Sequence, residues 1–96
     1  MTDASITPNA VPRRGDLPLV PTADAVFLLN VETGHYLMME GTAREIWDLV
    51  DGRREVQEIV SHLMNEFDID QESCTRDVSA FLSQLKDEGV IKFAAK

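Results

Sequence analysis

Residues His35 to Gly52, with the sequence HYLMMEGTAREIWDLVDG, have the pattern of a strand that leads directly into a helix, and the rest of the chain is arranged around this junction. Its first five residues have the length and aromatic content of a β-strand, and they include no proline that would interrupt pairing. Thr42 and Glu45 have the spacing of a capping box at a helix start. Apolar residues at helical spacing follow, and Gly52 ends the helix. The stretch therefore predicts a sheet that leads into helices.

Composition limits the classes of protein to consider. The chain has 96 residues, 44% of them hydrophobic, and a formal net charge of −8. This length suits one domain with a modest core. No apolar run approaches the ~20 residues of a membrane span, and no signal-peptide core is present, so we expect a cytoplasmic protein without a membrane partner. One cysteine, Cys74, excludes an internal disulfide.

The first third of the chain predicts an arm and then a meander. Residues 1–16 are rich in proline and small polar residues and predict a disordered N-terminal arm, so that the folded domain covers 17–96. Residues 30–34 (NVETG) have hairpin chemistry. We expect three antiparallel strands, the last on an edge of the sheet: 17–20, 25–29 and 35–39.

Three helices are expected after the meander, at about 43–50, 55–67 and 71–88. The second helix has an apolar stripe of Val56, Ile59, Val60, Leu63 and Phe67. Asp70 is a good N-cap for the third helix, whose apolar stripe of Cys74, Val78, Phe81, Leu82 and Leu85 ends before Gly89. Val90 to Phe93 is an apolar closing segment. A three-stranded antiparallel sheet followed by a three-helix bundle indicates an α+β domain of winged-helix type.

No catalytic or metal-binding pattern stands out. Glu58, His62 and Glu66 lie at i, i+4 and i+8 on one helix, but the outer two are about 12 Å apart, which favours a solvated polar face over a metal site. His35 has no carboxylate, serine or cysteine partner in a recognisable arrangement. No glycine-rich phosphate loop occurs. We therefore expect no enzyme activity, no metal and no cofactor.

DNA binding is the obvious alternative for a winged-helix fold. The third helix would be the recognition helix, yet it carries four acidic residues against only Arg76 and Lys86. Affinity for DNA comes largely from cations that neutralise phosphates. The sequence therefore predicts no nucleic-acid partner and favours a basic or apolar one.

Several segments together resemble the PqqD-like family, whose members are also called RiPP recognition elements. The similarity covers about residues 25–93, through LLNVETGHYLMMEGTAREIWDLVDG, EVQEIVSHLMNEFDID, DVSAFLSQL and EGVI. The chain departs from the family where Glu40 and Arg44 replace an Asn and a small residue, and where Arg54-Glu55 replaces a Pro-Thr helix start. These departures concern the starts of helices and lie outside the strand at 35–39 and the third helix.

The resemblance implies both a fold and a function. Members of the family have three strands and three helices, and they bind the leader segment of a ribosomally made precursor peptide as an added antiparallel strand between the third strand and the third helix. The sequence is more similar to stand-alone members, such as those of lasso-peptide pathways, than to the pyrroloquinoline-quinone protein itself, whose usual Pro-Glu pair near the second strand is absent here. The implied role is non-enzymatic delivery of the precursor to a modifying enzyme or leader peptidase. By position, the resemblance implies that the peptide lies between the strand His35–Met39 and the helix Gln71–Glu88, and a helical wheel favours the flank of that helix with Asp77, Phe81 and Gln84. The predicted peptide-binding residues are therefore His35, Tyr36, Leu37, Met38, Met39, Cys74, Asp77, Phe81 and Gln84.

Two alternatives stay open from the sequence. The opposite flank of the third helix, with Thr75, Ser79 and Leu82, could line the cleft in place of the flank with Asp77, Phe81 and Gln84. An apolar edge strand also invites a second subunit. The second function hypothesis is therefore a homo-oligomeric structural or regulatory winged-helix domain, a homodimer being one such form.

Overall fold

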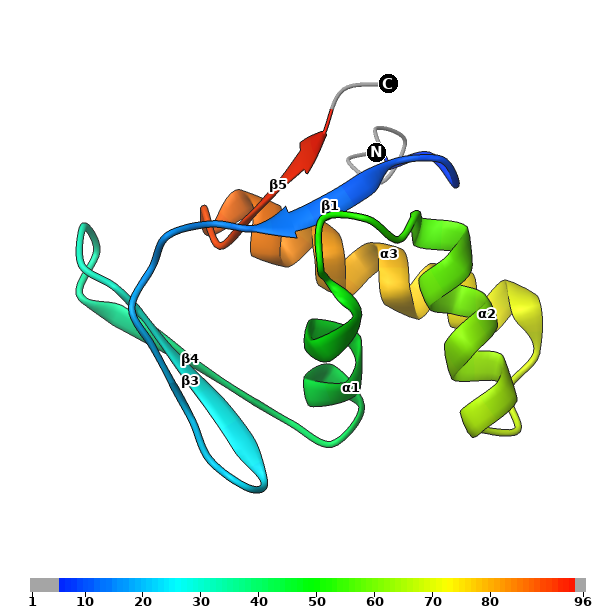
Figure 1. Cartoon of the computed structure of the whole chain (residues 1–96), viewed down its shortest axis with the longest axis horizontal. Coiled ribbons are helices and arrows are strands. Elements are labelled where there is room, and N and C mark those ends of the chain that lie inside the picture. Colours follow the sequence, from blue (N-terminus) through cyan, green and yellow to red (C-terminus); the bar gives the residue numbers. More distant parts are fainter. Residues whose placement is uncertain (1–5, 95–96) are drawn as a thin grey trace.

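The computed structural model describes residues 6–94 (Figure 1). A three-stranded antiparallel sheet of order β2-β3-β4 precedes three helices, which confirms the predicted α+β fold, and a second sheet pairs β1 with β5. None of the described helices is long and apolar enough to cross a membrane. The elements are β1 (Val11–Arg14), β2 (Leu19–Pro21), β3 (Ala25–Asn30), β4 (His35–Glu40), α1 (Thr42–Leu49), α2 (Val56–Glu66), α3 (Gln71–Asp87) and β5 (Ile91–Ala94).

The β3–β4 hairpin forms where the sequence predicts it. Asn30 pairs with His35 across the turn, and the register continues to the far end of both strands. Gly34 has φ 77°, a value that suits glycine, and its N–H donates to the Asn30 carbonyl oxygen at 2.8 Å. The Asn30 side-chain oxygen accepts from the N–H of Glu32 at 3.0 Å. These bonds fix the turn and thereby the register of β4.

The junction between β4 and α1 differs from the predicted capping box. Thr42 is already helical, and Gly41, with φ 61°, is the N-cap. The N–H of Glu45 donates to the Gly41 carbonyl at 3.1 Å, so the Thr42 hydroxyl is not needed as a cap. A capping box occurs instead at α2, where the Glu58 carboxylate accepts from the N–H of Glu55 at 2.7 Å.

The predicted disordered arm needs a correction, because residues 6–16 belong to the folded domain. β1 pairs with β5 over four residue pairs, and Val11 and Pro12 are buried. Residues 1–5 lie outside the described residues. The pairing partner of β1 comes from the other end of the chain, so no local pattern reveals it. The apolar closing segment forms β5.

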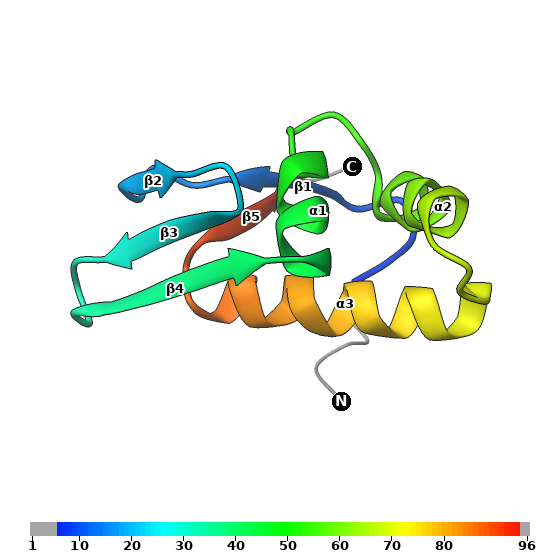
Figure 2. The same cartoon turned by 90° about the horizontal axis from the view of Figure 1, so that it is seen from below.

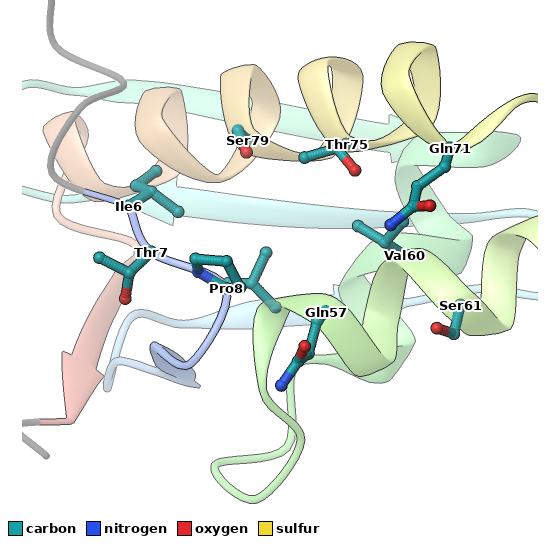
Figure 3. A pocket seen from close by; sticks show the side chains of 10 residues that line it. Ile6, Thr7, Pro8, Gln57, Val60, Ser61, Gln71, Thr75 and Ser79 are labelled. Carbon is teal, nitrogen blue, oxygen red and sulfur yellow. The ribbon is translucent and has the colours of Figure 1, made fainter.

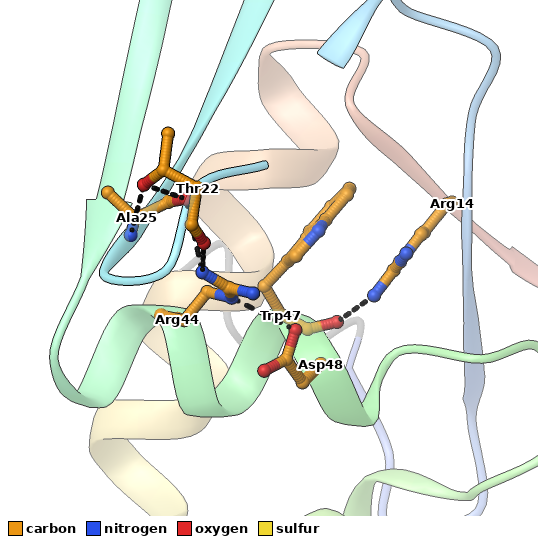
Figure 4. A network of polar contacts seen from close by, with 6 residues as sticks. All are labelled: Arg14, Thr22, Ala25, Arg44, Trp47 and Asp48. Atoms are coloured by element: carbon orange, nitrogen blue, oxygen red, sulfur yellow. Dashed lines mark hydrogen bonds and ion pairs between the residues drawn. The ribbon is translucent and has the colours of Figure 1, made fainter. Parts of the chain in front are cut away.

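Helix α1 is held from two sides (Figure 4). On one side the Arg14 guanidinium lies 4.4 Å from the centroid of the Trp47 ring and donates to the Trp47 carbonyl at 2.9 Å. On the other side Arg44 donates to the carbonyls of Thr22 and Ala25 at 2.9 and 3.1 Å. Trp47 is 2% exposed, as expected for a core residue. Both arginines thus position α1 between β1 and the β2–β3 turn.

One hydrophobic core joins the three-stranded sheet to the helices. Figure 2 shows α3 running along one side of the molecule, with the other elements above it. The apolar stripes predicted for the second and third helices are buried. Their buried residues are Val56, Ile59, Val60 and Leu63 on α2 and Cys74, Val78, Leu82 and Leu85 on α3.

Candidate functional site

The two edges of the three-stranded sheet are unequal. The β2 edge is only three residues long, follows Pro18 and ends in Pro21, and proline has no N–H to offer a further strand. The β4 edge is six residues long, contains no proline, and pairs only with β3 among the described strands. β4 is therefore the edge to which an extended chain can add.

The hydrogen bonds of β3 show which of its backbone N–H and C=O groups point toward β4. In an antiparallel strand, the N–H and C=O groups of successive residues point alternately to the two sides. The N–H of Leu29 donates to the Pro18 carbonyl at 3.1 Å, and the Ala25 carbonyl accepts from the N–H of Thr22 at 2.8 Å. The N–H and C=O groups of the odd-numbered residues of β3 thus point toward β2. The N–H and C=O groups of the even-numbered residues point toward β4.

The same alternation continues into β4. Leu37 pairs with Leu28, an even-numbered residue of β3, so the backbone groups of Leu37 are used within the sheet. The N–H and C=O groups of Tyr36, Met38 and Glu40 consequently point to the open edge. These three residues, rather than Leu37, offer the donors and acceptors for an added strand.

The side chains of β4 also alternate between two faces. Met39, 2% exposed, and the half-buried Leu37 face the core and the helices. Tyr36 and Met38 lie on the outer face and are 69% and 51% exposed. His35 is exposed at the hairpin end of the strand. The predicted strand residues therefore divide between the two faces of the sheet.

On α3, the predicted residues differ in how far their side chains are exposed. Asp77 and Gln84 are exposed, and Phe81 is half-buried at the margin of the core, as is Leu37 on β4. The C-terminal end of the helix is held to the hairpin by the Asn30 side-chain amide, which donates to the Glu88 carbonyl at 2.9 Å.

Cys74 and Met39 need a correction as peptide-contact residues, because both side chains are 2% exposed. The Cys74 Sγ lies 3.7 Å from the Val60 carbonyl oxygen of α2, inside the core. Burial, with a smaller contribution from Asp77 and Asp70, raises the pKa of the Cys74 thiol. The apolar stripe already indicated this position, and a small buried hydrophobe is its role here.

The opposite flank of α3 faces other parts of the chain. Thr75 and Ser79 line a cavity of about 270 Å³ between α3, α2 and the N-terminal segment, where Ile6 and Pro8 lie (Figure 3). Leu82, the third residue of that flank, is fully buried. This side of the helix is therefore adjacent to α2 and the segment before β1.

The sequence did not lead us to predict that residues of β2 and β3, together with Glu40, extend the face that carries Tyr36 and Met38. Val20, Phe27 and Leu29 share this face with Tyr36 and Met38 by register, and Glu40 continues the row along β4. A signal was present, because AVFLL at 25–29 is apolar at every position, whereas a strand with one solvated face alternates with polar residues. Among residues 6–94, no group of three or more histidine, cysteine, aspartate or glutamate side chains is placed to hold a metal ion.

Comparison with known proteins gives two matches in sequence. The family model described as coenzyme PQQ synthesis protein D (PqqD) matches residues 25–91. A protein of Gluconobacter oxydans (strain 621H) named "PqqA binding protein" is 41% identical over 54 residues, which is 56% of this chain and 56% of that protein. The matched region thus spans about half the length of this relative.

Solved structures agree with the fold. TbiB1 in complex with the TbiA(beta) leader peptide is 26% identical, with a TM-score of 0.76 over 88% of this chain and 99% of that chain. The PqqD truncation of Methylobacterium extorquens PqqCD, described as a functional and stand-alone RiPP recognition element, is 24% identical. Its TM-score is 0.72 over 96% of this chain and 99% of that chain, and at this identity the likeness concerns the fold.

Proposed function

This chain belongs to the PqqD family, and from that premise we propose that it binds the leader segment of a ribosomally made precursor peptide as a fourth strand at β4. The observation that carries the proposal is the open, proline-free edge of β4, with outward backbone groups at Tyr36, Met38 and Glu40. A relative named for binding PqqA and a structural neighbour in complex with a leader peptide support it.

Backbone pairing alone is too weak for a micromolar complex. Tyr36, Met38 and Glu40 each offer one donor and one acceptor, and each hydrogen bond contributes about 0.5–1.5 kcal/mol in net terms. A micromolar dissociation constant requires about −8 kcal/mol. Ordering a flexible peptide offsets much of the gain from pairing. Side chains of the peptide must therefore be buried as well, at about 1.5–3 kcal/mol for each large apolar group.

The inner anchors of the peptide would lie between β4 and α3. Leu37 and Phe81 are both half-buried at the margin of the core, where a peptide side chain can cover them. Asp77 and Gln84, exposed on the same flank of α3, supply a carboxylate and an amide for polar groups of the peptide. We favour this flank because Thr75 and Ser79 are turned toward the cavity beside α2.

The proposed role is non-catalytic delivery of the bound precursor to a modifying enzyme or leader peptidase. A homo-oligomeric structural domain, the second function hypothesis, is not favoured by the comparisons. Two β4 edges could also pair with each other to form a homodimer. Sedimentation with and without peptide separates these uses, because a peptide that occupies β4 would dissociate such a dimer.

The test is an NMR titration of the ¹⁵N-labelled full chain. If the gene neighbourhood of this chain contains a small precursor gene, a synthetic peptide covering its leader region is the probe, and a scrambled peptide of the same composition is the control. We expect amide shifts at Tyr36–Met39 and along α3, with the scrambled peptide inactive. Shifts confined to α2, or equal shifts with the scrambled peptide, would refute strand addition at β4.

A further inference from the structure

The outer face of the three-stranded sheet, on the side away from the helices, is apolar over all three strands. By register, Val20 lies opposite Phe27, which lies opposite Met38, and Leu29 lies opposite Tyr36. Val20, Tyr36 and Met38 are each more than half exposed, and Leu29 is 40% exposed. We call these five residues, with Glu40 at the end of β4, the outer face.

This composition is unusual for a solvated sheet face. An antiparallel sheet with one face in water normally carries polar residues there, and contiguous exposed apolar patches commonly mark interaction sites. The chain has 17 acidic residues and a net charge of −8, yet Glu40 is the only charged member of the outer face. The exposed apolar surface therefore suits a ligand with apolar groups.

Strand addition at β4 would place peptide side chains on this face. Residues directly opposite each other in an antiparallel pair have their side chains on the same face, with Cβ atoms about 4.5–5.5 Å apart. Three peptide residues at spacing two would then stand opposite Glu40, Met38 and Tyr36, in that order along the peptide. The side chain opposite Met38 would extend the row that runs from Val20 through Phe27.

Glu40 is available to bind a cation. Its carboxylate has no ion pair among residues 6–94. The nearby Arg44, whose side chain reaches the Ala25 carbonyl, is already paired with Asp48 at 3.2 Å. Ala25 is the residue opposite Glu40 on β3 and offers no charge. A lysine or arginine on an added strand could therefore pair with Glu40 without displacing an existing partner.

We propose that the outer face of the sheet reads the precursor peptide through the pattern basic–x–apolar–x–apolar. The basic residue lies opposite Glu40, and the two apolar residues lie opposite Met38 and Tyr36. This inference rests on the proposed strand addition and extends it, because it assigns specificity to the face turned away from α3. A second copy of the chain fits the outer face poorly, since it would bring another net charge of −8 and another Glu40.

The experiment selects ligands from a displayed library of random 14-residue peptides on the full-length protein. Peptides that also bind Met38→Pro are discarded, because that variant lacks an outward N–H of β4; Tyr36→Pro serves as a second filter if Met38→Pro does not fold. We expect the remaining peptides to be enriched in the basic–x–apolar–x–apolar pattern. Selection on Glu40→Lys should replace the basic residue by aspartate or glutamate.

A selected peptide, made synthetically, then measures the contribution of each side chain. Replacing either apolar residue by serine should weaken binding about two- to fivefold, and that loss should disappear against Tyr36→Ser or Met38→Ser, whichever removes its partner. Val31→Ser is the matched control, because Val31 is 65% exposed in the hairpin turn, between β3 and β4.

The outcomes separate the two proposals. The peptides that depend on the β4 edge could show no preference at the positions opposite Glu40, Met38 and Tyr36, or the same residue opposite position 40 could be selected with Glu40→Lys. Either result would overturn the proposed pattern and leave strand addition intact. If no selected peptide depends on the β4 edge, both proposals fail.

Discussion

The two sheets of this small domain differ in how their outer edges are used. The outer side of β1 is covered, since the N–H of Gly52 donates to the Pro12 carbonyl at 3.1 Å and the N–H of Val56 donates to the Ala10 carbonyl at 2.9 Å. The outer side of β4 is free among the described strands. The outer edge of β1 is therefore hydrogen-bonded within the domain, whereas the outer edge of β4 in the β2–β4 sheet is available for an added strand. Changes in the first should alter stability, and changes at the edge of the second should alter binding.

The largest expected effect comes from deleting residues 1–16. This removes the four β1–β5 residue pairs, the buried Val11 and Pro12, and the contact of Arg14 with Trp47. We expect loss of the cooperative thermal transition, measured by circular dichroism. The control lacks only residues 1–5 and keeps every contact described above. A deletion variant that melts like the full chain would show that the β1–β5 sheet is dispensable.

Trp47→Ala should have the next largest effect, because the indole is almost fully buried next to β1. We expect a loss of about 3–5 kcal/mol in the free energy of unfolding, measured by urea denaturation. Asp48→Ala is the neighbouring control; it breaks only an exposed pair with Arg44 and should lose about 0.5 kcal/mol or less. A loss under about 1 kcal/mol for Trp47→Ala would contradict its role in the core.

Two proline substitutions on β4 distinguish its edge-facing N–H groups from those that pair with β3. Met38→Pro removes an edge-facing N–H and should leave stability within about 1 kcal/mol of the wild type while peptide binding is lost. Leu37→Pro removes an N–H that pairs with β3, so it should lower stability by about 3 kcal/mol or more. Thermal melts and peptide titrations measure both. If Met38→Pro were the less stable of the two variants, the N–H of Met38 would face β3 and the N–H of Leu37 would face the open edge, contrary to the assignment above.

The smallest effect concerns the start of α3, away from both sheet edges. The Asp70 carboxylate accepts from the N–H of Ser73 at 3.0 Å, and this bond holds the pKa of Asp70 below its ordinary value of 3.8. A lowered pKa in the folded state stabilises the fold above the ordinary value, and this contribution is lost as pH falls through the folded-state pKa. Asp70→Ala should therefore be less stable than wild type at neutral pH, and the gap should close below pH 3.8.

Urea denaturation at several pH values measures this gap. Asp68→Ala, which removes a nearby carboxylate that caps none of the described helices, is the control for the loss of one negative charge. Peptide binding at neutral pH should be the same for Asp70→Ala as for the wild type. A gap that widens as pH falls would contradict the capping role of the ionised carboxylate.

Most of the fold was predictable because it depends on local patterns. The NVETG turn, the Asp70 cap and the apolar stripes of α2 and α3 each act within a few residues, and each is where the sequence indicates. β1 was not predictable, because its partners come from the loop after α1 and from the C-terminal strand. The Thr42 capping box failed because Gly41 starts the helix one residue earlier than the pattern implied.

The candidate site was predictable only in outline. The edge position of β4 followed from the order of strands, but the direction of its backbone groups depends on the register with β3 and on the Leu29–Pro18 bond. Because of that direction, proline at Met38, and not at Leu37, removes an N–H group that faces the open edge. The burial of Met39 and Cys74 likewise depends on which face of each element meets the core.

The pairing of β1 with β5 also has a consequence for the order of folding. Val11 and Ala94 stand opposite each other from nearly opposite ends of the described chain, so this sheet cannot form during synthesis until the last strand has left the ribosome. Contacts of such long sequence separation form slowly, and pulse-labelling hydrogen exchange should find the amides of these two strands protected last. Until β5 is available, the open edge of β4 is part of an incompletely folded domain, and exposed strand edges in such intermediates are prone to pair with neighbouring nascent chains. We expect the net negative charge of the chain to disfavour pairing between nascent copies, because like charges repel each other.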